Sequence, residues 1–181
     1  MEILIRPWRM EDLPAVRRIL WESWMAAYSA FIPEEDLRNY HEATYRIDSL
    51  ANLFKSTFVH GFIGVADGTA AGFARTQFHV NENRLYLASL YLLPAFQRRG
   101  IGGGLLRAAE EKARDYGLEE LWVGVMVWNE AARHWYDKRG FRFVREEPFR
   151  MGRTTVPHRI GYKMIGESDL SGSVPAGFVP P

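Results

Sequence analysis

A glycine-rich segment, residues 97–104, carries the clearest chemical signal of the sequence. It reads Gln-Arg-Arg-Gly-Ile-Gly-Gly-Gly and lies between a predicted strand and the predicted start of a helix. Successive small residues allow backbone N–H groups to close around an anion, and the positive end of the helix dipole adds to the attraction. Arg98 and Arg99 supply further charge. The segment therefore predicts a phosphate site, with pyrophosphate as the favoured ligand.

Two other phosphate-binding loops fit this segment poorly. A P-loop ends in Gly-Lys, and the sequence contains no such dipeptide. The dinucleotide fingerprint GxGxxG matches Gly100 and Gly102, but Leu105 occupies the position of its third glycine. From these residues alone, a glycine-rich helix start that binds no ligand is the remaining alternative.

The elements before this loop are predicted to be a strand, two helices and three strands. Residues 2–6 alternate apolar and polar side chains, and an amphipathic helix follows. A second helix is predicted from residue 34 into the 50s. Residues 59–66 and 70–80 are strand-like and flank Asp-Gly, which is typical of tight hairpins. Residues 84–93 form the third strand and lead into the glycine-rich loop.

The elements after the loop predict a βαβ unit. Gly117 ends the helix that starts in the loop, and residues 121–127 are almost continuously apolar, as expected beside a parallel neighbour. Asn129 is a good N-cap for one more helix. Residues 141–145 and 159–165 are the last strands, separated by a loop. The fold class is therefore α/β (α+β), with a mixed, mostly antiparallel sheet, one parallel βαβ unit and flanking helices.

Composition limits the classes of protein to which this chain can belong. Its 181 residues fit one domain, which we expect over residues 1–165, with a flexible Gly/Ser/Pro-rich tail at 166–181. The net charge of +1 argues against a nucleic-acid partner, and no run reaches the about 18 apolar residues of a membrane span. The opening residues contain no secretory signal. We therefore expect a soluble, cytoplasmic protein.

Metal sites and covalent catalysis through sulfur are not expected. The chain has no cysteine, which excludes thiolate ligands and a cysteine nucleophile. The five histidines do not occur at metal-ligand spacing, so surface or turn positions are expected for them. They are His41, His60, His79, His134 and His158.

Two separate segments resemble one protein family. Residues 97–102 match Gln/Arg-x-x-Gly-x-Gly/Ala directly after the predicted strand that ends in Leu-Tyr-Leu-Leu-Pro. Residues 129–141 are close to Asn-x-x-Ala-x-x-Phe-Tyr-x-Lys-x-Gly-Phe, with Trp135 in place of Phe. In this order they resemble the GCN5-related N-acetyltransferase (GNAT) family, and the resemblance extends over residues 3–165. It implies the acyl-CoA N-acyltransferase fold.

The resemblance implies acetyl-CoA as co-substrate. The loop would take the pyrophosphate. The strand before it would bulge and diverge from the next strand, so that its backbone groups pair with the pantetheine arm and the acetyl oxygen. Asn129 would either cap its helix or bond the cofactor arm. The residues implied to bind acetyl-CoA are Leu90, Tyr91, Leu92, Gln97, Arg98, Arg99, Gly100, Ile101, Gly102, Gly103 and Asn129.

Tyr136 is the general acid that the resemblance implies. A phenol stays protonated at neutral pH and can donate its proton to the departing thiolate. The helical pattern alone also allows Tyr136 to be a core aromatic, and we expect either Trp135 or Tyr136 to face the cleft. We assign no general base, because residues 84–90 contain no acid; Glu82 precedes them. The predicted acceptor-side residues are Trp24, Tyr28, Glu34, Glu35 and Tyr86.

We expect an N-acetyltransferase in which an amine attacks acetyl-CoA directly in a ternary complex. A small amine such as a polyamine is the favoured acceptor, and a protein N-terminus or lysine is the second choice. The carboxylates available to line a polyamine cleft are Glu34, Glu35, Asp36 and Glu42. The alternative from another class is a non-catalytic acyl-CoA-binding regulatory domain. The last hairpin and the tail are candidate contact surfaces for a homodimer.

Overall fold

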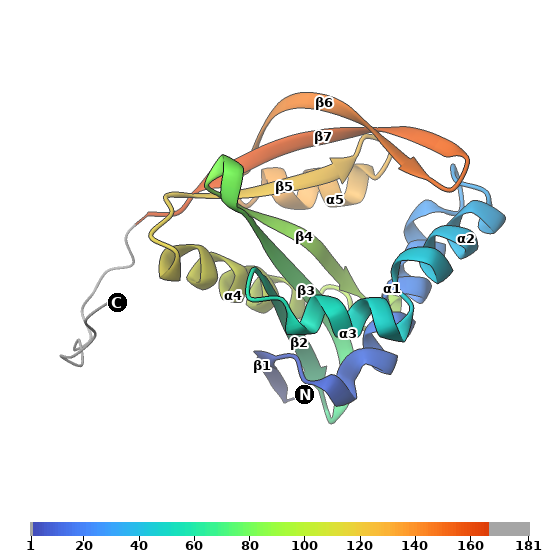
Figure 1. The fold of residues 1–181 in the computed structure, drawn as a ribbon, viewed down its shortest axis with the longest axis horizontal. Helices are drawn as coiled ribbons and strands as arrows, with labels where there is room; N and C mark the ends of the chain where they lie inside the picture. The colour runs from blue at the N-terminus through green and yellow to red at the C-terminus, as the bar shows by residue number, and fades with distance from the viewer. Residues whose placement is uncertain (1, 167–181) are drawn as a thin grey trace.

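The computed structural model describes residues 2–166, which form a seven-stranded sheet flanked by helices (Figure 1). The strands are β1 (Ile3–Pro7), β2 (Val59–Ala66), β3 (Thr69–His79), β4 (Arg84–Leu92), β5 (Glu120–Met126), β6 (Arg142–Met151) and β7 (Thr154–Met164). The helices are α1 (Leu13–Tyr28), α2 (Glu34–Thr44), α3 (Ile47–Lys55), α4 (Ile101–Asp115) and α5 (Glu130–Asp137). Short 3-10 turns occur at Met10–Asp12, Val80–Glu82 and Pro94–Phe96.

The sheet has the strand order β1-β2-β3-β4-β5-β7-β6. Neighbouring strands are antiparallel except for β4 and β5, which are parallel and joined through α4. The predicted fold class is therefore confirmed. No helix within residues 2–166 combines the length and the apolar character needed to cross a bilayer. The predicted tail lies, apart from Gly166, outside the described residues.

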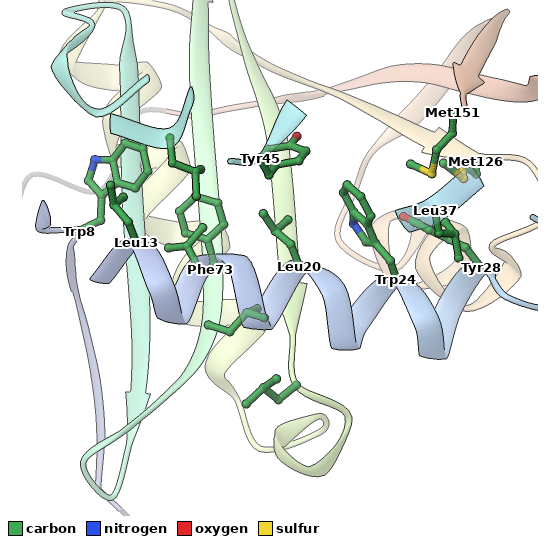
Figure 2. Packing of buried hydrophobic residues seen from close by; sticks show 14 of the residues in the cluster. Trp8, Leu13, Leu20, Trp24, Tyr28, Leu37, Tyr45, Phe73, Met126 and Met151 are labelled. Carbon is green, nitrogen blue, oxygen red and sulfur yellow. The ribbon is translucent and has the colours of Figure 1, made fainter. Parts of the chain in front are cut away.

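Helices cover both faces of the sheet. On one face α1 and α3 pack around a cluster that includes Trp8, Trp24 and Phe73. Figure 2 shows Trp24 and Tyr28 extending from α1 toward the sheet, with Tyr45 beside Trp24. On the other face α4 packs its apolar side over β2, β3 and β4. The faces are called the α1 face and the α4 face below.

The long helix predicted from residue 34 into the 50s is wrong, because the structure has two helices there. α2 ends at Thr44, and Tyr45 leaves the helical conformation with φ −117° and ψ 33°. Its buried ring contacts Trp24 edge-on, with ring centroids 5.4 Å apart. Burial of this aromatic ring in the core redirects the chain into α3. The local helical pattern on either side does not reveal such a long-range contact.

The last two strands are longer than predicted. The sequence predicts a loop around Gly152 and Pro157, but β6 and β7 pair, with one irregularity at Val144, up to Met151 and Thr154. Pro157 faces Pro148 in this register, close to the end of the β5–β7 pairing. Pro148 is tolerated because β6 is an edge strand. Pro157 is tolerated because the β5–β7 pairing ends at His158, so that no carbonyl of β5 needs an N–H from residue 157. The turn itself contains only residues 152 and 153.

Asp36 ties this hairpin to α2. Its carboxylate accepts hydrogen bonds from the Arg153 backbone N–H at 2.9 Å and from the Thr154 hydroxyl at 2.6 Å. These bonds, that from Thr154 foremost, hold the pKa of Asp36 below its ordinary value. The turn can approach this closely because Gly152, with φ +63°, has no side chain; a Cβ there would lie 2.5 Å from Asp36 Oδ1. α2 and the β6–β7 hairpin are thereby held together.

An ion pair fixes the junction between β1 and α1. Two guanidinium nitrogens of Arg6 donate to Asp12 at 2.7 and 2.8 Å, and the Arg9 backbone N–H donates at 2.7 Å. The hydrogen bonds from Arg6 are the main reason that the pKa of Asp12 lies below its ordinary value. The carboxylate therefore stabilises the fold above its unfolded-state pKa of about 4, and this stabilisation is lost as the pH falls through the lower folded-state pKa.

The variant Asp12→Asn is expected to lower the free energy of unfolding at pH 7 by about 1–3 kcal/mol, because it removes charge-assisted hydrogen bonds from a buried group. It should also reduce the loss of stability between pH 7 and pH 3, because one carboxylate with a depressed pKa is gone. Urea unfolding at both pH values measures the two quantities. Equal acid-dependent losses in wild type and variant would contradict this assignment.

Candidate active site

β4 and β5 run side by side only over their first residues. Register pairs Leu85–Leu87 with Leu121–Val123, and beyond these pairs the two strands diverge (Figure 1). The later part of β4, residues 88–92, therefore has no strand partner on the β5 side. Backbone N–H and C=O groups need partners when they are shielded from water. One of them, the Leu92 carbonyl, accepts a hydrogen bond from the Ser23 hydroxyl at 2.8 Å.

β4 also contains a bulge where this divergence begins. Leu87 pairs with Thr76 on β3 and Ser89 pairs with Arg75, so Ala88 has no counterpart. A bulge bends its strand and increases the local twist. The structure thus has both features that the family resemblance implied for this strand, and they present residues 90–92 along an open edge.

The loop after β4 ends in unsatisfied amides. Gly100, with φ +89°, is the N-cap of α4, and no side chain caps this helix. The helical hydrogen bonds start with the Gly104 N–H on the Gly100 carbonyl at 3.1 Å, so the N–H groups of residues 101–103 lack helical acceptors. Gln97, Arg98 and Arg99 are exposed beside them. These donors, the adjacent charge and the helix dipole fit a pyrophosphate.

Gly102 has a packing role that the sequence did not predict. A Cβ at Gly102 would lie 3.3 Å from both Leu92 Cδ1 and Trp135 Cζ2. Trp135 is half-buried, and the Arg139 guanidinium lies 3.7 Å from its ring centroid. The loop and α5, which carry the two sequence motifs, are therefore in direct contact.

Tyrosines from α1, β4 and α5 gather near the open edge of β4. The Tyr28 hydroxyl is 3.3 Å from the Tyr91 hydroxyl and also hydrogen-bonds the side chain of Asn129. Burial raises the pKa of Tyr28, of Tyr91 and of Tyr136 above the ordinary value of a phenol. All three remain protonated proton donors at neutral pH.

Tyr136 is the more buried residue of the Trp135–Tyr136 pair. It is 7% exposed and contacts Phe141 and Trp135 edge-on at 5.1 and 5.0 Å between ring centroids. Its hydroxyl makes no hydrogen bond within residues 2–166, and the Tyr28 phenol is close enough to affect its pKa. Asn129 caps α5, because its Oδ1 accepts the Ala132 N–H at 3.1 Å. The capping role left open by the sequence is thus present.

The predicted acceptor-side residues do not form one group. Tyr28 lies with the tyrosines described above. Trp24 is 2% exposed and packs beneath Tyr45, so it supports the site without lining it. Tyr86 donates to Glu82 at 2.8 Å, on the part of β4 that is paired with β5.

The four carboxylates proposed for a polyamine are engaged elsewhere. Glu34 pairs with Arg38 on the exposed side of α2, and Glu35 pairs with Arg153 at 3.1 Å. Asp36 holds the hairpin turn, as described above. Glu42 pairs with Arg17 at 2.6 Å. Each of the four carboxylates therefore already has a partner within residues 2–166.

From the sequence, no functional role is predicted for His158. It lies on β7 opposite Met126, in the part of β5 that has diverged from β4. A Cβ on Gly124 of β5 would lie 2.5 Å from His158 Cε1, so the ring occupies the space that the glycine leaves. Burial lowers the pKa of His158, against the opposing effects of Glu147 and of a hydrogen bond with the Gly124 backbone. The imidazole is therefore neutral at pH 7. The expected surface or turn position is wrong for this residue because the strand continues through it.

His41 is a second correction among the histidines. It is buried on α2, where its Nε2 lies 3.0 Å from the Arg17 carbonyl oxygen and its ring contacts Trp21 and Trp24. It belongs to the contact between α1 and α2. Within residues 2–166, no three His, Asp or Glu side chains gather as a group that could hold a metal ion.

Comparison with known proteins settles the family. The model of the acetyltransferase (GNAT) family matches residues 13–141. The chain belongs to the GNAT family. It is an acetyl-CoA-dependent N-acetyltransferase, and acetyl-CoA is its co-substrate.

Three similar proteins illustrate this GNAT relationship. An uncharacterized N-acetyltransferase in the pepI 3′ region of Lactobacillus delbrueckii subsp. lactis is 30% identical over 148 residues, covering 78% of this chain and 86% of the relative. Spermidine N(1)-acetyltransferase of Thermoplasma acidophilum is 30% identical over 146 residues, covering 78% and 89%. The crystal structure of PaiA N-acetyltransferase from Thermoplasma acidophilum in complex with coenzyme A superposes with a TM-score of 0.78 at 26% identity, covering 91% and 99%.

Gly100→Val is expected to abolish the rise in melting temperature that acetyl-CoA gives the wild type, because valine resists a φ of +89° and distorts the amides of the loop. Gly117→Val is the matched control: Gly117 has φ +68°, and neither glycine has a neighbour within 4 Å of an added Cβ.

Both variants should lose about 1–2 kcal/mol of stability from backbone strain. Only Gly100→Val should lose stabilisation by the ligand. Thermal unfolding with and without acetyl-CoA separates the two effects. Equal stabilisation of both variants would contradict the assignment of the loop.

Proposed function

We propose that this enzyme acetylates the primary amine of a small molecule by direct attack within a ternary complex. The observation that carries this proposal is the open edge of β4, which lies between the amides of the α4 start and the cluster of buried tyrosines. A covalent acyl-cysteine route has no candidate, because the 181 residues include no cysteine.

The backbone of β4 would orient the donor. Residues 90–92 follow the bulge and lack a strand partner on the β5 side, so their N–H groups on that side can donate to the acetyl oxygen and to the pantetheine amides. A donor that is fixed before the reaction stabilises the charge developing on the oxygen with little reorganisation. The pyrophosphate, held by residues 100–103, would set the position of the thioester along β4.

The chemical step requires two proton movements. The amine nitrogen attacks the carbonyl carbon, a carbon–nitrogen bond forms, and the carbon–sulfur bond breaks. The thiolate sulfur takes a proton from the Tyr136 hydroxyl. The nitrogen gives up one proton to a base. The proton count balances once Tyr136 has regained a proton from solvent and the base has released one to solvent. The raised pKa of Tyr136 keeps the phenol protonated before each turnover, and it also makes the phenol a weaker acid toward the thiolate.

His158 is the group that we propose as acceptor of the amine proton. It lies on the α1 face, as its position over Gly124 shows, and Phe149 packs against its ring with centroids 5.0 Å apart. A neutral imidazole whose one nitrogen hydrogen-bonds a backbone group keeps the other nitrogen available as a base. The acids considered from the sequence are occupied in the ion pairs and hydrogen bonds described above.

A thiol-release assay with acetyl-CoA and a panel of primary amines tests the function. Spermidine belongs in the panel because one relative is a spermidine acetyltransferase; peptides with free N-termini and lysines test the second class of acceptor. We expect release of coenzyme A with at least one small amine. Tyr136→Phe should lower kcat about 100-fold, the scale of general acid catalysis.

Tyr116→Phe is the control for this variant, because Tyr116 bonds His60 at 2.9 Å on the α4–β2 side, away from β4's open edge. It should retain wild-type kcat. Unchanged kcat in Tyr136→Phe would remove Tyr136 as the acid, and no release with any amine would contradict the function.

The pH profile tests His158 separately. Because the base must be neutral and burial lowers its pKa, kcat at saturating amine should fall as the pH drops below about 6.5, the ordinary histidine value. His158→Gln should lower kcat about 10–100-fold and remove this acid limb. Stopped assays between pH 5 and pH 8 with one amine measure it. An unchanged limb in the variant would exclude His158 as the base.

A further inference from the structure

A pocket of about 440 Å³ lies between β3 and the α2–α3 junction, on the α1 face of the sheet. Its lining residues are Thr44, Tyr45, Ser49, Asn52, Leu53, Arg75 and Gln77. They include no acid, so the only formal charge in the lining is that of Arg75. The volume suits a small organic molecule.

Arg75 is a buried cation without an anionic partner. It is 7% exposed, and its Nη1 donates to the Gln77 side-chain oxygen at 3.0 Å. Its Nε is buried without a hydrogen-bond partner, and none of the carboxylates within residues 2–166 pairs with it. A guanidinium stays protonated in proteins, and an unpaired buried charge is costly. Arg75 is therefore a charged lining residue that no carboxylate within residues 2–166 neutralises.

The surrounding polar groups are neutral and can donate hydrogen bonds to an anion. Thr44, Ser49 and Tyr45 contribute hydroxyls, and Asn52 contributes an amide. The Arg75 charge also reaches Tyr40, where it opposes the rise in pKa that burial causes. A planar anion with two oxygens matches the fork of a guanidinium and these donors better than a neutral or cationic group does.

β3, which contributes Arg75 and Gln77 to the pocket, pairs with β4. Arg75 is the register partner of Ser89 on β4, so their side chains lie on the same face of the sheet. Ser89 follows the bulge and directly precedes residues 90–92. Its hydroxyl is likewise buried without a hydrogen-bond partner. Arg75 Nε and Ser89 Oγ are thus two buried polar atoms without a hydrogen-bond partner on paired residues, one in the lining of the pocket and one next to residues 90–92.

We propose that this pocket binds a carboxylate of the acceptor, with Arg75 as its main partner, so that the acceptor is a small amine that carries a free carboxylate. This inference rests on the proposed function, since it names the acceptor class of the same site. A polyamine would bring a second ammonium group toward the buried guanidinium, where like charges repel. The lining of the pocket contains no carboxylate that could pair with that ammonium group.

Matched pairs of amines test the proposal: 4-aminobutanoate against butylamine, 6-aminohexanoate against hexylamine, and lysine against 1,5-diaminopentane, with spermidine as the polyamine. In the wild type, kcat/KM should be at least about tenfold higher for the carboxylate-bearing member of at least one pair. Arg75→Met should reduce this ratio about tenfold or more, and Arg75→Lys should restore part of it. The KM for acetyl-CoA should stay the same in the Arg75 variants while the ratio of kcat/KM within each amine pair changes.

A second variant keeps the test independent of the buried position. Asn52 is exposed on α3 at the rim of the pocket, and Asn52→Asp adds a negative charge with the same shape. It should lower kcat/KM for the carboxylate-bearing amines and raise it for spermidine. Arg38→Met is the matched control on the outer side of α2, and it should leave the ratio unchanged. Thermal unfolding reports whether each variant is folded.

Calorimetric titration of the same amines into the enzyme, without acetyl-CoA, separates the two proposals. Carboxylate-dependent binding that Arg75→Met removes, without any acetyl transfer, would support the pocket and contradict the proposed function. Acetyl transfer with equal kcat/KM within every pair, or with a ratio that Arg75→Met and Asn52→Asp leave unchanged, would overturn the pocket assignment and leave the function standing.

Discussion

The incomplete pairing of β4 with β5 is the constraint on which the rest of the structure depends. Three register pairs hold the strands together, and then the bulge at Ala88 and the turn into η3 (Pro94–Phe96) carry β4 away. A fully paired sheet would satisfy its own backbone and offer nothing to a ligand. Apart from the Leu92 carbonyl, which accepts from Ser23, the backbone groups on this side are left to bond with water or with a peptide-like group that takes the place of β5. α4 and α5 are positioned by the same divergence.

The two faces of the sheet carry different chemical groups. The α4 face and the start of α4 present amides and exposed arginines, which suit an anionic donor. The α1 face holds the neutral imidazole of His158, the buried guanidinium of Arg75 and the pocket between β3 and the α2–α3 junction. Tyr28 lies at the junction, hydrogen-bonded to β4 through Tyr91 and to the cap of α5 through Asn129. The proposed chemistry, which needs one group from each side, would therefore take place at the edge of a single strand.

The sequence predicted the parts of this arrangement that are local. Residues 97–104, Asn129 and the apolar faces of α1 and α4 are encoded within one turn or one helix, so spacing alone reveals them. It did not reveal Arg75, His158 or the role of Asp36. Each depends on a partner more than 10 residues away along the chain: Ser89 for Arg75, Gly124 for His158 and Thr154 for Asp36. Strand register and the end of α2 at Tyr45 determine which of these distant residues lie together, and neither can be predicted from local periodicity.

The contact between Gly102 and Trp135 has a consequence for how sequences of this kind diverge. An added methyl at residue 102 would press on the indole and on Leu92 at 3.3 Å, which is tighter than ordinary packing. Any enlargement of the loop residue therefore demands a smaller or displaced ring on α5. That helix carries Tyr136 in the next position, so the phenol would move with it. Positions 102 and 135 form a single steric unit, and in related chains we expect their volumes to vary in opposite directions.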